Sequence, residues 1–524
     1  MNPVDQREKE MILLFDRFQR ELRHRYEVPA PDSGLDRPLD SHLEDTLAEL
    51  AALTGQTADL QVNRLEIEGY RLAFVMFEGL VSNQTLILGT ASDLHRILSG
   101  HRISPGQLPE RLCQELFMAG DKKILHSYKE LIQFIASGFA VLLVDSCAEG
   151  VALGVQGFSF RSVGEPAAEN NLRGSREGFA EPVRINMSMI RRRMKTPSLR
   201  MKLLQIGEKS HTDVCLVYRS DYADPEMVRR VEERLQSVRL DNLMDSGYLR
   251  PFLENGPFSL FSGTGITERP DTLCAKVSEG RIAILVDGSP DAILLPCLFS
   301  EHFQSMDDYA ERPYYATLMR IIKYLAFFLT ILLPGSYVAA VNFHPELIPD
   351  QLLFRIAQAE RDMAFPLMFQ ALLIHFIYEL MREAGLRLPR PVGHAVSIIG
   401  ALVIGDAAVT AGLISTPMVM VVALTTISSF VIPSLYEPVT LLRLVFILLG
   451  GTLGLFGVVL GLAFVGVSLC SVTVLGVPAT SPETPLFPYS LRDTLIRVGW
   501  RRLGQEQFII SRTAGASPDE EAQP

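Results

Sequence analysis

The chain has 524 residues, of which 48% are hydrophobic and 21% charged, and its formal net charge is −11. The charges are unevenly distributed, because residues 324–480 hold only 14 of the 109 charged side chains. This segregation excludes a disordered chain and a wholly soluble one, and the acidic body argues against nucleic acid as a main partner, since phosphates must be neutralised by Lys and Arg.

Residues 1–60 predict a mostly polar, helical N-terminal segment. A secretory signal is not expected, because the apolar run Met11–Phe15 is too short for one. The six cysteines are scattered without a CxxC pair, which fits a reducing cytoplasm and indicates neither a disulfide framework nor a metal site.

Residues 61–178 predict a first cytoplasmic α/β subdomain, because apolar, β-rich runs alternate with helical patterns. Strands are predicted at Arg71–Val81 and Gly138–Asp145, and Gly150–Phe160 follows the second of these at hairpin distance. The helical patterns are Ser92–Ile97 and Pro109–Met118.

Residues 179–312 predict a basic helical arm, Phe179–Lys202, followed by a second α/β subdomain. The predicted strands are Asp213–Arg219, Thr272–Val277, Arg281–Asp287 and Ala292–Pro296, and the predicted helix is Pro225–Val238. No internal repeat is evident in the sequence. Arg191, Arg192 and Arg193 of the arm could contact anionic lipid headgroups or phosphate. A solvated face, or a contact with an acidic neighbouring subunit, is the more common role for such a charge run.

Residues 313–480 predict a transmembrane domain of five or six spans, since a bilayer core requires about 20 apolar helical residues. The first four predicted spans are Tyr324–Phe343, Phe365–Met381, Gly393–Leu413 and Met418–Tyr436. The uncharged run Leu444–Val477 is interpreted as one long span followed by a partial or bent one. Between the first two spans, His344–Asp362 is amphipathic, which is typical of a helix in the membrane interface.

The distribution of Lys and Arg predicts the orientation of these spans. Basic clusters precede the first span at Arg312–Lys323 and follow the second at Arg382–Arg390, which places both on the cytoplasmic side. The body would then be cytoplasmic. Residues 481–524 would form a cytoplasmic C-terminal tail if Leu444–Val477 crosses twice.

Ionisable and hydroxyl side chains inside the apolar block are the candidate functional residues. Asp406 should face protein or water, either in an ion pathway or as a protonated group bonded to another helix. Thr425 and Ser429 could line the same pore, although hydroxyls in helices often bond back to their own backbone. Glu379 is expected to form a structural ion pair with Arg382, and His375 to be a helix-packing residue.

Four glycines, Gly450, Gly454, Gly457 and Gly461, recur at helical spacing and predict a seam where another backbone approaches closely. The nucleotide-binding, metalloprotease and hydrolase motifs GxxxxGK[ST], HExxH, GxSxG and GxGxxG do not occur. We therefore expect no catalytic activity, cofactor or metal.

Several longer motifs resemble the GerA family of spore germination proteins, A subunit. The body carries RGSREGF at Arg173–Phe179 and MIRRRMK at Met189–Lys195, with Ser175 where the family has Pro. The apolar block carries FHPELIP at Phe343–Pro349, REAGLRLPRP at Arg382–Pro391 and VIGDAA at Val403–Ala408. The acidic residue of VIGDAA is similar to the sporulation-stage paralogues, so the resemblance covers both these and the germinant-receptor A subunits.

This resemblance implies a multi-pass protein of the spore inner membrane with a two-part cytoplasmic N-terminal region. It implies a nutrient-sensing germinant receptor in which the chain meets membrane lipid, a B-type membrane subunit and a C-type lipoprotein. It also implies a homo-oligomer that encloses a cation-conducting pore. The alternatives from the residues alone are a secondary transporter and a structural scaffold subunit of a membrane complex.

Overall fold

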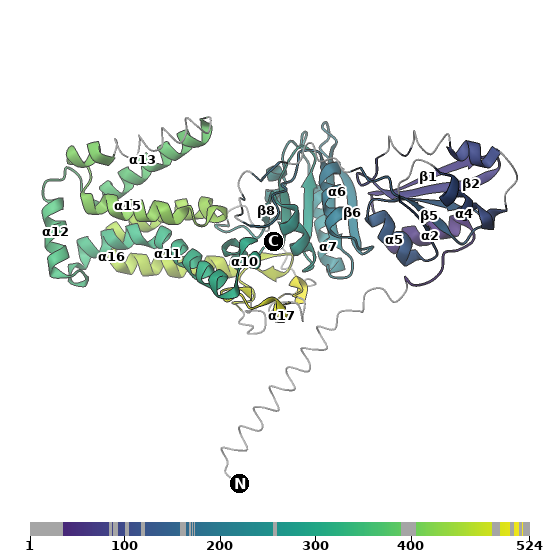
Figure 1. Ribbon diagram of the computed structural model, residues 1–524. Coiled ribbons are helices and arrows are strands. Elements are labelled where there is room, and N and C mark those ends of the chain that lie inside the picture. Colours follow the sequence, from purple (N-terminus) through teal and green to yellow (C-terminus); the bar gives the residue numbers. More distant parts are fainter. Residues whose placement is uncertain are drawn as a thin grey trace, which may run out of the picture.

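The structure is a computed structural model that describes most of the chain. The described residues are 35–82, 86, 93–99, 104–116, 121–157, 164–166, 169, 171, 173–254, 259–388, 405–484, 493–503, 508–512 and 516. The larger parts of the predicted N-terminal segment, of the span Gly393–Leu413 and of the tail after residue 512 lie outside these ranges. Two α/β subdomains and a helical bundle follow one another along the molecule (Figure 1).

The first subdomain is a five-stranded sheet between two helical layers. Its strands are β1 (Leu60–Ile67), β2 (Tyr70–Phe77), β3 (Lys122–Leu125), β4 (Ala140–Val144) and β5 (Gly150–Leu153), in the order β1-β2-β4-β5-β3 with every neighbouring pair antiparallel. Successive residues of β2 face opposite sides. Phe74 packs towards residues 93–99 and α4 (Leu108–Glu115), and Val75 packs towards α2 (Leu43–Thr54) and α5 (Tyr128–Ala136).

The second subdomain repeats this architecture. Its strands are β6 (Leu199–Ile206), β7 (Thr212–Arg219), β8 (Gly265–Thr267), β9 (Ile282–Val286) and β10 (Ala292–Leu295), in the order β6-β7-β9-β10-β8, again antiparallel. Helices α6 (Val183–Arg193) and α9 (Pro270–Val277) cover one face, and α7 (Pro225–Ser237) covers the other. A short helix, α8 (Arg250–Leu253), follows α7. The two sheets therefore have the same strand order, a repeat of topology that is not evident in the sequence.

Most predicted strands are confirmed, but two elements of the second subdomain were predicted wrongly. Thr272–Val277 belongs to helix α9, because Leu273 and Val277 have helical spacing and face the core together. The basic helical arm ends at Arg193, and Leu199–Lys202 are already part of strand β6.

The helical bundle is formed by the apolar part of the sequence. After the short helix α10 (Asp307–Ala310), its described helices are α11 (Pro313–Phe343), α12 (Asp350–Glu360), α13 (Leu367–Arg387), α15 (Thr416–Ser429) and α16 (Tyr436–Ser471). Helix α12 lies at the end of the bundle that is farthest from the sheets (Figure 1). Among the described residues, two helices are long and apolar enough to cross a membrane, Pro313–Phe343 and Pro433–Ser471, and Thr416–Ser429 is a shorter apolar helix.

Helix α16 is a hairpin of two antiparallel limbs. Gly454 has φ 64° and ψ −151°, which is not helical. A Cβ on Gly461 would contact Leu449 and Phe446, although 15 residues of straight helix would separate Gly461 from Phe446 by about 22 Å. The interpretation of Leu444–Val477 as one long span with a partial or bent one is therefore wrong. Limbs 436–453 and 455–471 are of similar length.

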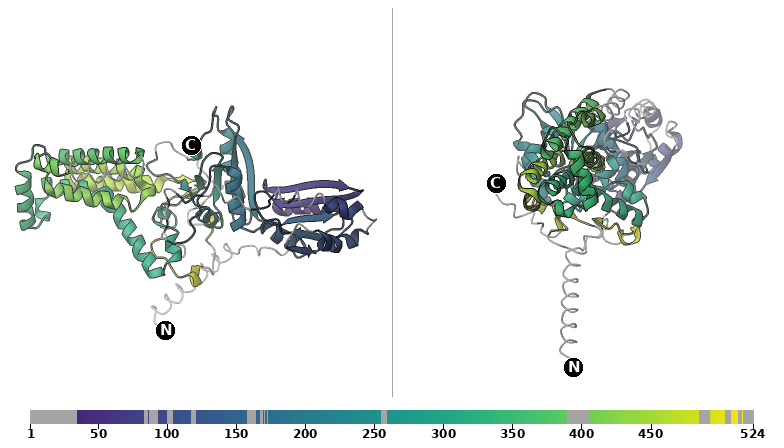
Figure 2. Two further views of the ribbon diagram at one scale, coloured as in Figure 1. Left: turned by 45° about the horizontal axis from the view of Figure 1, so that its top comes forward. Right: turned by 90° about the vertical axis from the view of Figure 1, so that its left-hand side faces the viewer.

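The chain enters and leaves the bundle at the end that lies against the second subdomain. Helix α11 begins directly after α10, and α16 is followed by the hairpin of β11 (Thr473–Val474) and β12 (Val477–Pro478), whose Val474 and Val477 enter the hydrophobic core of that subdomain. Ile510 enters the same core. Two further views show the bundle extending from the second subdomain on the side away from the first (Figure 2).

Candidate functional site

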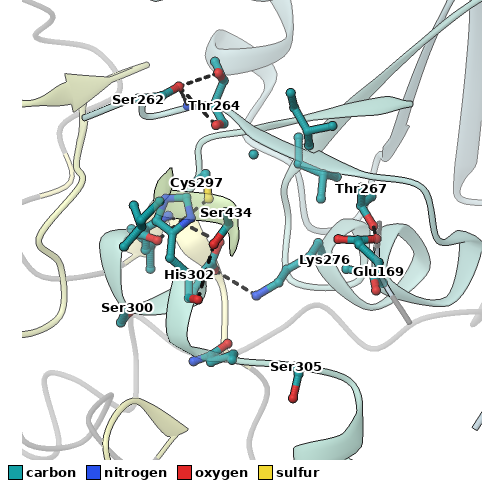
Figure 3. A pocket seen from close by; sticks show the side chains of 18 of the residues that line it. Glu169, Ser262, Thr264, Thr267, Lys276, Cys297, Ser300, His302, Ser305 and Ser434 are labelled. Carbon is teal, nitrogen blue, oxygen red and sulfur yellow. Dashed lines mark hydrogen bonds and ion pairs between the residues drawn. The ribbon is translucent and has the colours of Figure 1, made fainter. Parts of the chain in front are cut away.

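A cavity of about 1770 Å³ lies where the second subdomain meets the foot of the bundle. We call it the junction cavity. Lys276 of α9 and the short helix η3 (Phe299–Phe303) line it from the subdomain, and Arg382 of α13 and the first turn of α16 line it from the bundle. Figure 3 shows Lys276, Cys297, His302 and Ser434 around it. Its volume exceeds the usual 300–1000 Å³ of small-molecule sites. It therefore resembles an open gap between the second subdomain and the bundle more than a closed ligand pocket.

A buried ion-pair network forms the subdomain wall of this cavity. The carboxylate of Glu301 pairs with Lys276 at 2.9 Å and with the fully buried Arg281, which also pairs with Glu279. Burial alone would raise the pKa of Glu301, but the charges of Arg281 and Lys276 outweigh it and lower this pKa to about 2. Glu301 therefore stays ionised. Burial lowers the pKa of the neighbouring His302 to about 4, so this imidazole is neutral at pH 7.

A second buried arginine joins the foot of the bundle to the C-terminal segment. Arg320 of α11 is fully buried and contacts Asp308 at 2.8 Å and Asp493 at 3.0 Å. It also donates to the carbonyl of Thr494 at 3.0 Å. A rotation of α11 would therefore disturb α10 and the C-terminal segment together.

Inside the bundle, Glu379 of α13 forms an ion pair, but not with the predicted partner. Its carboxylate contacts the guanidinium of Arg443 and accepts a hydrogen bond from the hydroxyl of Tyr436 at 2.5 Å, both on α16. The guanidinium of Arg382 lies over the ring of Tyr436 instead. His375 is fully buried and its Nδ1 lies 2.8 Å from the carbonyl of Ala371.

The three pore candidates do not lie together on one surface. Asp406 is exposed near the start of the described range 405–484. Thr425 and Ser429 are buried inside the protomer, and their hydroxyls donate to the carbonyls of Val421 and Thr426 at 2.7 Å each. These two hydroxyls thus bond back to their own helix, and the pore role of all three residues stays a prediction.

The four seam glycines lie on the two limbs of α16 and at the turn between them. A Cβ on Gly450 would collide with the carbonyl of Gly335 in α11. Gly454 forms the turn of the hairpin, while Gly457 and Gly461 face Leu449 of the first limb. The glycines permit close approach, but the expected single helix face is wrong because the chain reverses at Gly454.

The three arm arginines have different environments. Arg191 is fully buried between the two subdomains, where its guanidinium pairs with Asp59 at 2.6 Å, so it is not available to a surface anion. Arg192 and Arg193 both contact the carboxylate of Glu177, at 2.6 Å and 2.5 Å. Their role towards a partner or an anion stays a prediction.

Sequence reasoning missed the two networks at the junction. In the sequence, Arg320 indicates only the orientation of the first span, and Arg281 only the start of a strand. Glu279 lies only two residues before Arg281, but Glu301 lies 20 residues after Arg281 and Asp493 lies 173 residues after Arg320. No local sequence pattern indicates these distant partners. Among the described residues, no group of three or more His, Cys, Asp or Glu side chains is placed to hold a metal ion.

The chain is similar in sequence to proteins of one family. A family model described as Bacillus/Clostridium GerA spore germination protein matches residues 48–507. The chain is 36% identical over 472 residues to spore germination protein KA of Bacillus subtilis, covering 89% of this chain and 86% of that protein. It is 34% identical over 487 residues to the membrane protein YfkQ of Bacillus subtilis, covering 92% and 94%.

A further relative is spore germination protein GerLA of Bacillus cereus, which is 31% identical over 465 residues, covering 88% of this chain and 94% of that protein. Among solved structures, the N-terminal domain of the A subunit of the Bacillus megaterium spore germinant receptor GerK3 is similar. It is 26% identical, covers 50% of this chain and 98% of that domain, and superposes with a TM-score of 0.40.

Proposed function

The chain belongs to the GerA family of spore germination proteins, and from that membership we propose that it is a multi-pass membrane subunit of a nutrient-sensing germinant receptor. The observation that carries this proposal is the match over residues 48–507 together with relatives that are named spore germination proteins along nearly their whole length. The relative YfkQ is named a membrane protein, and two helices of this chain have the length and composition of membrane spans.

The arrangement of the bundle supports an even number of crossings. Helix α11 leaves the second subdomain, and the segment after α16 returns to its hydrophobic core. A chain that starts and ends on one side of a membrane crosses it an even number of times. This favours six spans over five, with the body and residues 473–512 together in the cytoplasm, as the basic residues near the foot of the bundle also suggest.

The hairpin limbs suit this arrangement. Limbs 436–453 and 455–471 would each extend about 25 Å, close to the hydrocarbon thickness of a bilayer. Their outer faces carry large exposed apolar side chains, including Leu448, Phe456 and Phe464. Lipid, a second copy of the chain or a B-type subunit would cover these faces.

We propose further that copies of the chain surround a ligand-gated cation pathway, with the B-type membrane subunit and the C-type lipoprotein as partners. The resemblance suggests this, and the exposed carboxylate of Asp406 is its best candidate on the protomer surface. Thr425 and Ser429 would line the pathway only if α15 rotated. The binding of nutrient to a partner would open the pore only by favouring one arrangement of the packed helices over another.

Reconstitution of the chain with its partner subunits in potassium-loaded vesicles tests this function. A channel releases potassium down its gradient without stoichiometric coupling, a secondary transporter shows coupled and saturable uptake, and a scaffold shows neither. An Asp406→Ala variant that still assembles should release potassium more slowly. Unchanged release in this variant would remove Asp406 from the pore.

A further inference from the structure

Buried polar atoms without a hydrogen-bond partner are concentrated in the bundle. Of the fifteen such side-chain atoms among the described residues, ten lie there, and nine of these remain when Nη2 of Arg320 at its foot is set aside. They are the hydroxyls of Tyr337, Tyr378, Ser415, Thr426 and Thr440, Oε1 of Glu360, Nε2 of His375, and Nε and Nη1 of Arg443. An unpaired polar group in an apolar environment is costly, so something that can donate and accept hydrogen bonds should fill these positions.

The first group of these atoms, on His375, Thr440 and Arg443, lies between α13 and α16. His375, Glu379 and Arg382 are spaced four and three residues apart on α13, and Tyr436, Thr440 and Arg443 have the same spacing on α16. These side chains join the two helices: Glu379 contacts Arg443 and Tyr436, and Arg382 stacks on Tyr436. We call these six residues the inner cluster.

The inner cluster opens into the junction cavity. Arg382, Tyr436 and Thr440 line that cavity, whereas Arg443 and His375 are fully buried about 10 Å further along their helices. The unpaired Nε and Nη1 of Arg443 and the unpaired hydroxyl of Thr440 can each bond a water molecule. A buried water needs two to four polar partners, and this group supplies them.

A second group lies at the far end of the bundle. Gln370 donates to Glu360 at 2.6 Å and accepts from the backbone N–H of Ser415 at 2.9 Å. The second carboxylate oxygen of Glu360 and the hydroxyls of Ser415 and Tyr337 have no partner. We call Tyr337, Glu360, Gln370 and Ser415 the outer cluster.

One apolar layer separates the two clusters. Gln370 and His375 are only five residues apart on α13, about 7.5 Å along the helix. Ala371, Ile374, Met418, Val422 and Ile447 are buried in a single hydrophobic cluster around this level. On α15, Val422 lies on the same helix face as Ser415 and Thr426, seven and four residues away, so it interrupts a line of hydroxyls.

We propose that water fills both clusters and that the interior of each protomer is a proton pathway whose barrier is this apolar layer. The groups along it are carboxylates, an imidazole and hydroxyls, which pass protons along hydrogen bonds. A metal cation is disfavoured, because the side chains of the apolar layer cannot replace its shell of water, whereas a proton passes along hydrogen bonds between hydroxyls and water molecules. Apolar constrictions of this kind close a path by excluding water.

This pathway runs through one copy of the chain and does not use the pore proposed between copies. It rests on the proposal that the bundle crosses a membrane. It does not rest on the oligomer or on Asp406, so the two pathways can fail separately.

Hydroxyl-radical footprinting of the full wild-type chain in vesicles tests the hydration first. Radicals formed from bound water should modify Tyr378, which precedes Glu379 on α13 and has an unpaired buried hydroxyl, more than Met418 of the apolar layer, although methionine is intrinsically the more reactive residue. More modification of Met418 than of Tyr378 would overturn the proposal, and this test needs no variant.

Proton flux into vesicles that carry a trapped pH-sensitive dye tests the barrier. Val422→Thr keeps the side-chain shape and places a hydroxyl in the apolar layer, so proton flux should rise several-fold over the wild type. Val459→Thr is the matched control, because Val459 is exposed on the outer face of α16. Adding Thr440→Val to Val422→Thr should lower the flux again, whereas adding Thr452→Val, on an exposed position of α16, should not.

Potassium release is measured in the same vesicles to separate the two proposals. Equal proton flux through the Val422→Thr and Val459→Thr proteins, with both inserted, would overturn the proton pathway alone. A chain that alkaline carbonate washes off the vesicles would overturn the membrane proposal and this one with it. A rise in proton flux with unchanged potassium release is the expected result.

Discussion

The backbone of Gly450 in α16 lies directly against the carbonyl of Gly335 in α11, so closely that a Cβ at either position would collide with the other helix. This contact fixes the first limb of α16 along α11. It follows that the seam of the bundle tolerates only glycine at these two positions.

Substitution of Gly450 by valine should therefore destabilise the bundle. Overpacking of this kind costs about 3 kcal/mol, which should appear as a lower thermal unfolding temperature in detergent. Gly466→Val is the matched control, since no atom lies within 4 Å of a Cβ at this exposed position of the same helix. Equal loss of stability in both variants would contradict the Gly335–Gly450 contact.

The pair of Arg191 and Asp59 should be the main polar contact between the subdomains. Both side chains are almost fully buried, so Asp59→Asn would leave a buried guanidinium without its countercharge, at a cost of about 3–5 kcal/mol in urea unfolding. The pair of Arg184 and Glu78 also joins the subdomains but is partly exposed, so Glu78→Gln should cost less than about 1 kcal/mol. A reversed order of the two effects would show that Arg191 is not the main link.

The stability of the folded chain should depend on pH through Glu483, which follows β12 and is next in sequence to Pro482 of the junction-cavity lining. Burial raises the pKa of Glu483 to about 7 from its ordinary value of 4.5. Between these values the folded chain holds a proton that the unfolded chain has lost, so stability is greatest below pH 4.5 and falls as the pH rises to 7. His302 acts in the opposite direction, because burial lowers its pKa to about 4.

The Glu483→Gln variant isolates the contribution of Glu483. It should be more stable than the wild type at pH 8 by about 2 kcal/mol, and nearly equal to it at pH 5, in denaturant unfolding. Parallel pH profiles of the two proteins would mean that Glu483 ionises freely.

Arg320 should hold the C-terminal segment to the foot of α11. Removing its charge in Arg320→Met leaves Asp493 without its cation and Asp308 with only Lys323, at 3.5 Å, so protease should cut residues 493–503 at least about tenfold faster. Arg312→Ala is the control, because among the described residues the side chain of Arg312 hydrogen-bonds only to the exposed Tyr314, and the substitution keeps its backbone bonds to α11. Unchanged cleavage in Arg320→Met would refute the link.

Continuous apolar runs made the central strands predictable. Gly138–Asp145 and Arg281–Asp287 contain β4 and β9, which are buried on both faces. The same two runs resemble each other, since each strand is preceded by a glycine and each run ends in Leu-Val-Asp. Gly138 and Gly280 have φ 86° and 87°.

The two aspartates at these strand ends have the same structural role. Asp145 accepts a hydrogen bond from the backbone N–H of Leu43 at the start of α2, at 3.1 Å, and Asp287 accepts one from Val183 at the start of α6, at 2.9 Å. Two short similar runs are too little to indicate a duplicated fold by themselves, because the intervening helices differ in sequence and length.

The buried charge pairs could not be predicted, because their partners are distant in sequence. Asp59 lies 132 residues before Arg191, and Arg443 lies 64 residues after Glu379. Helical spacing suggested Arg382 as the partner of Glu379, but only the packing of α13 against α16 decides which cation is nearer. The reversal of the chain at Gly454 could not be predicted either, because glycines at helical spacing are equally compatible with one face of a straight helix.

Labelling of single reporter sites from outside intact protoplasts tests the central claim, that the bundle crosses the membrane and returns to the side of the body. Reporter cysteines would be placed at Asp221 in the second subdomain, at Gln351 on α12 and at Ala516 near the C-terminus. We predict that a membrane-impermeant thiol reagent reaches only the site on α12. Labelling of Ala516 with protection of Asp221 would show an odd number of crossings and contradict the account.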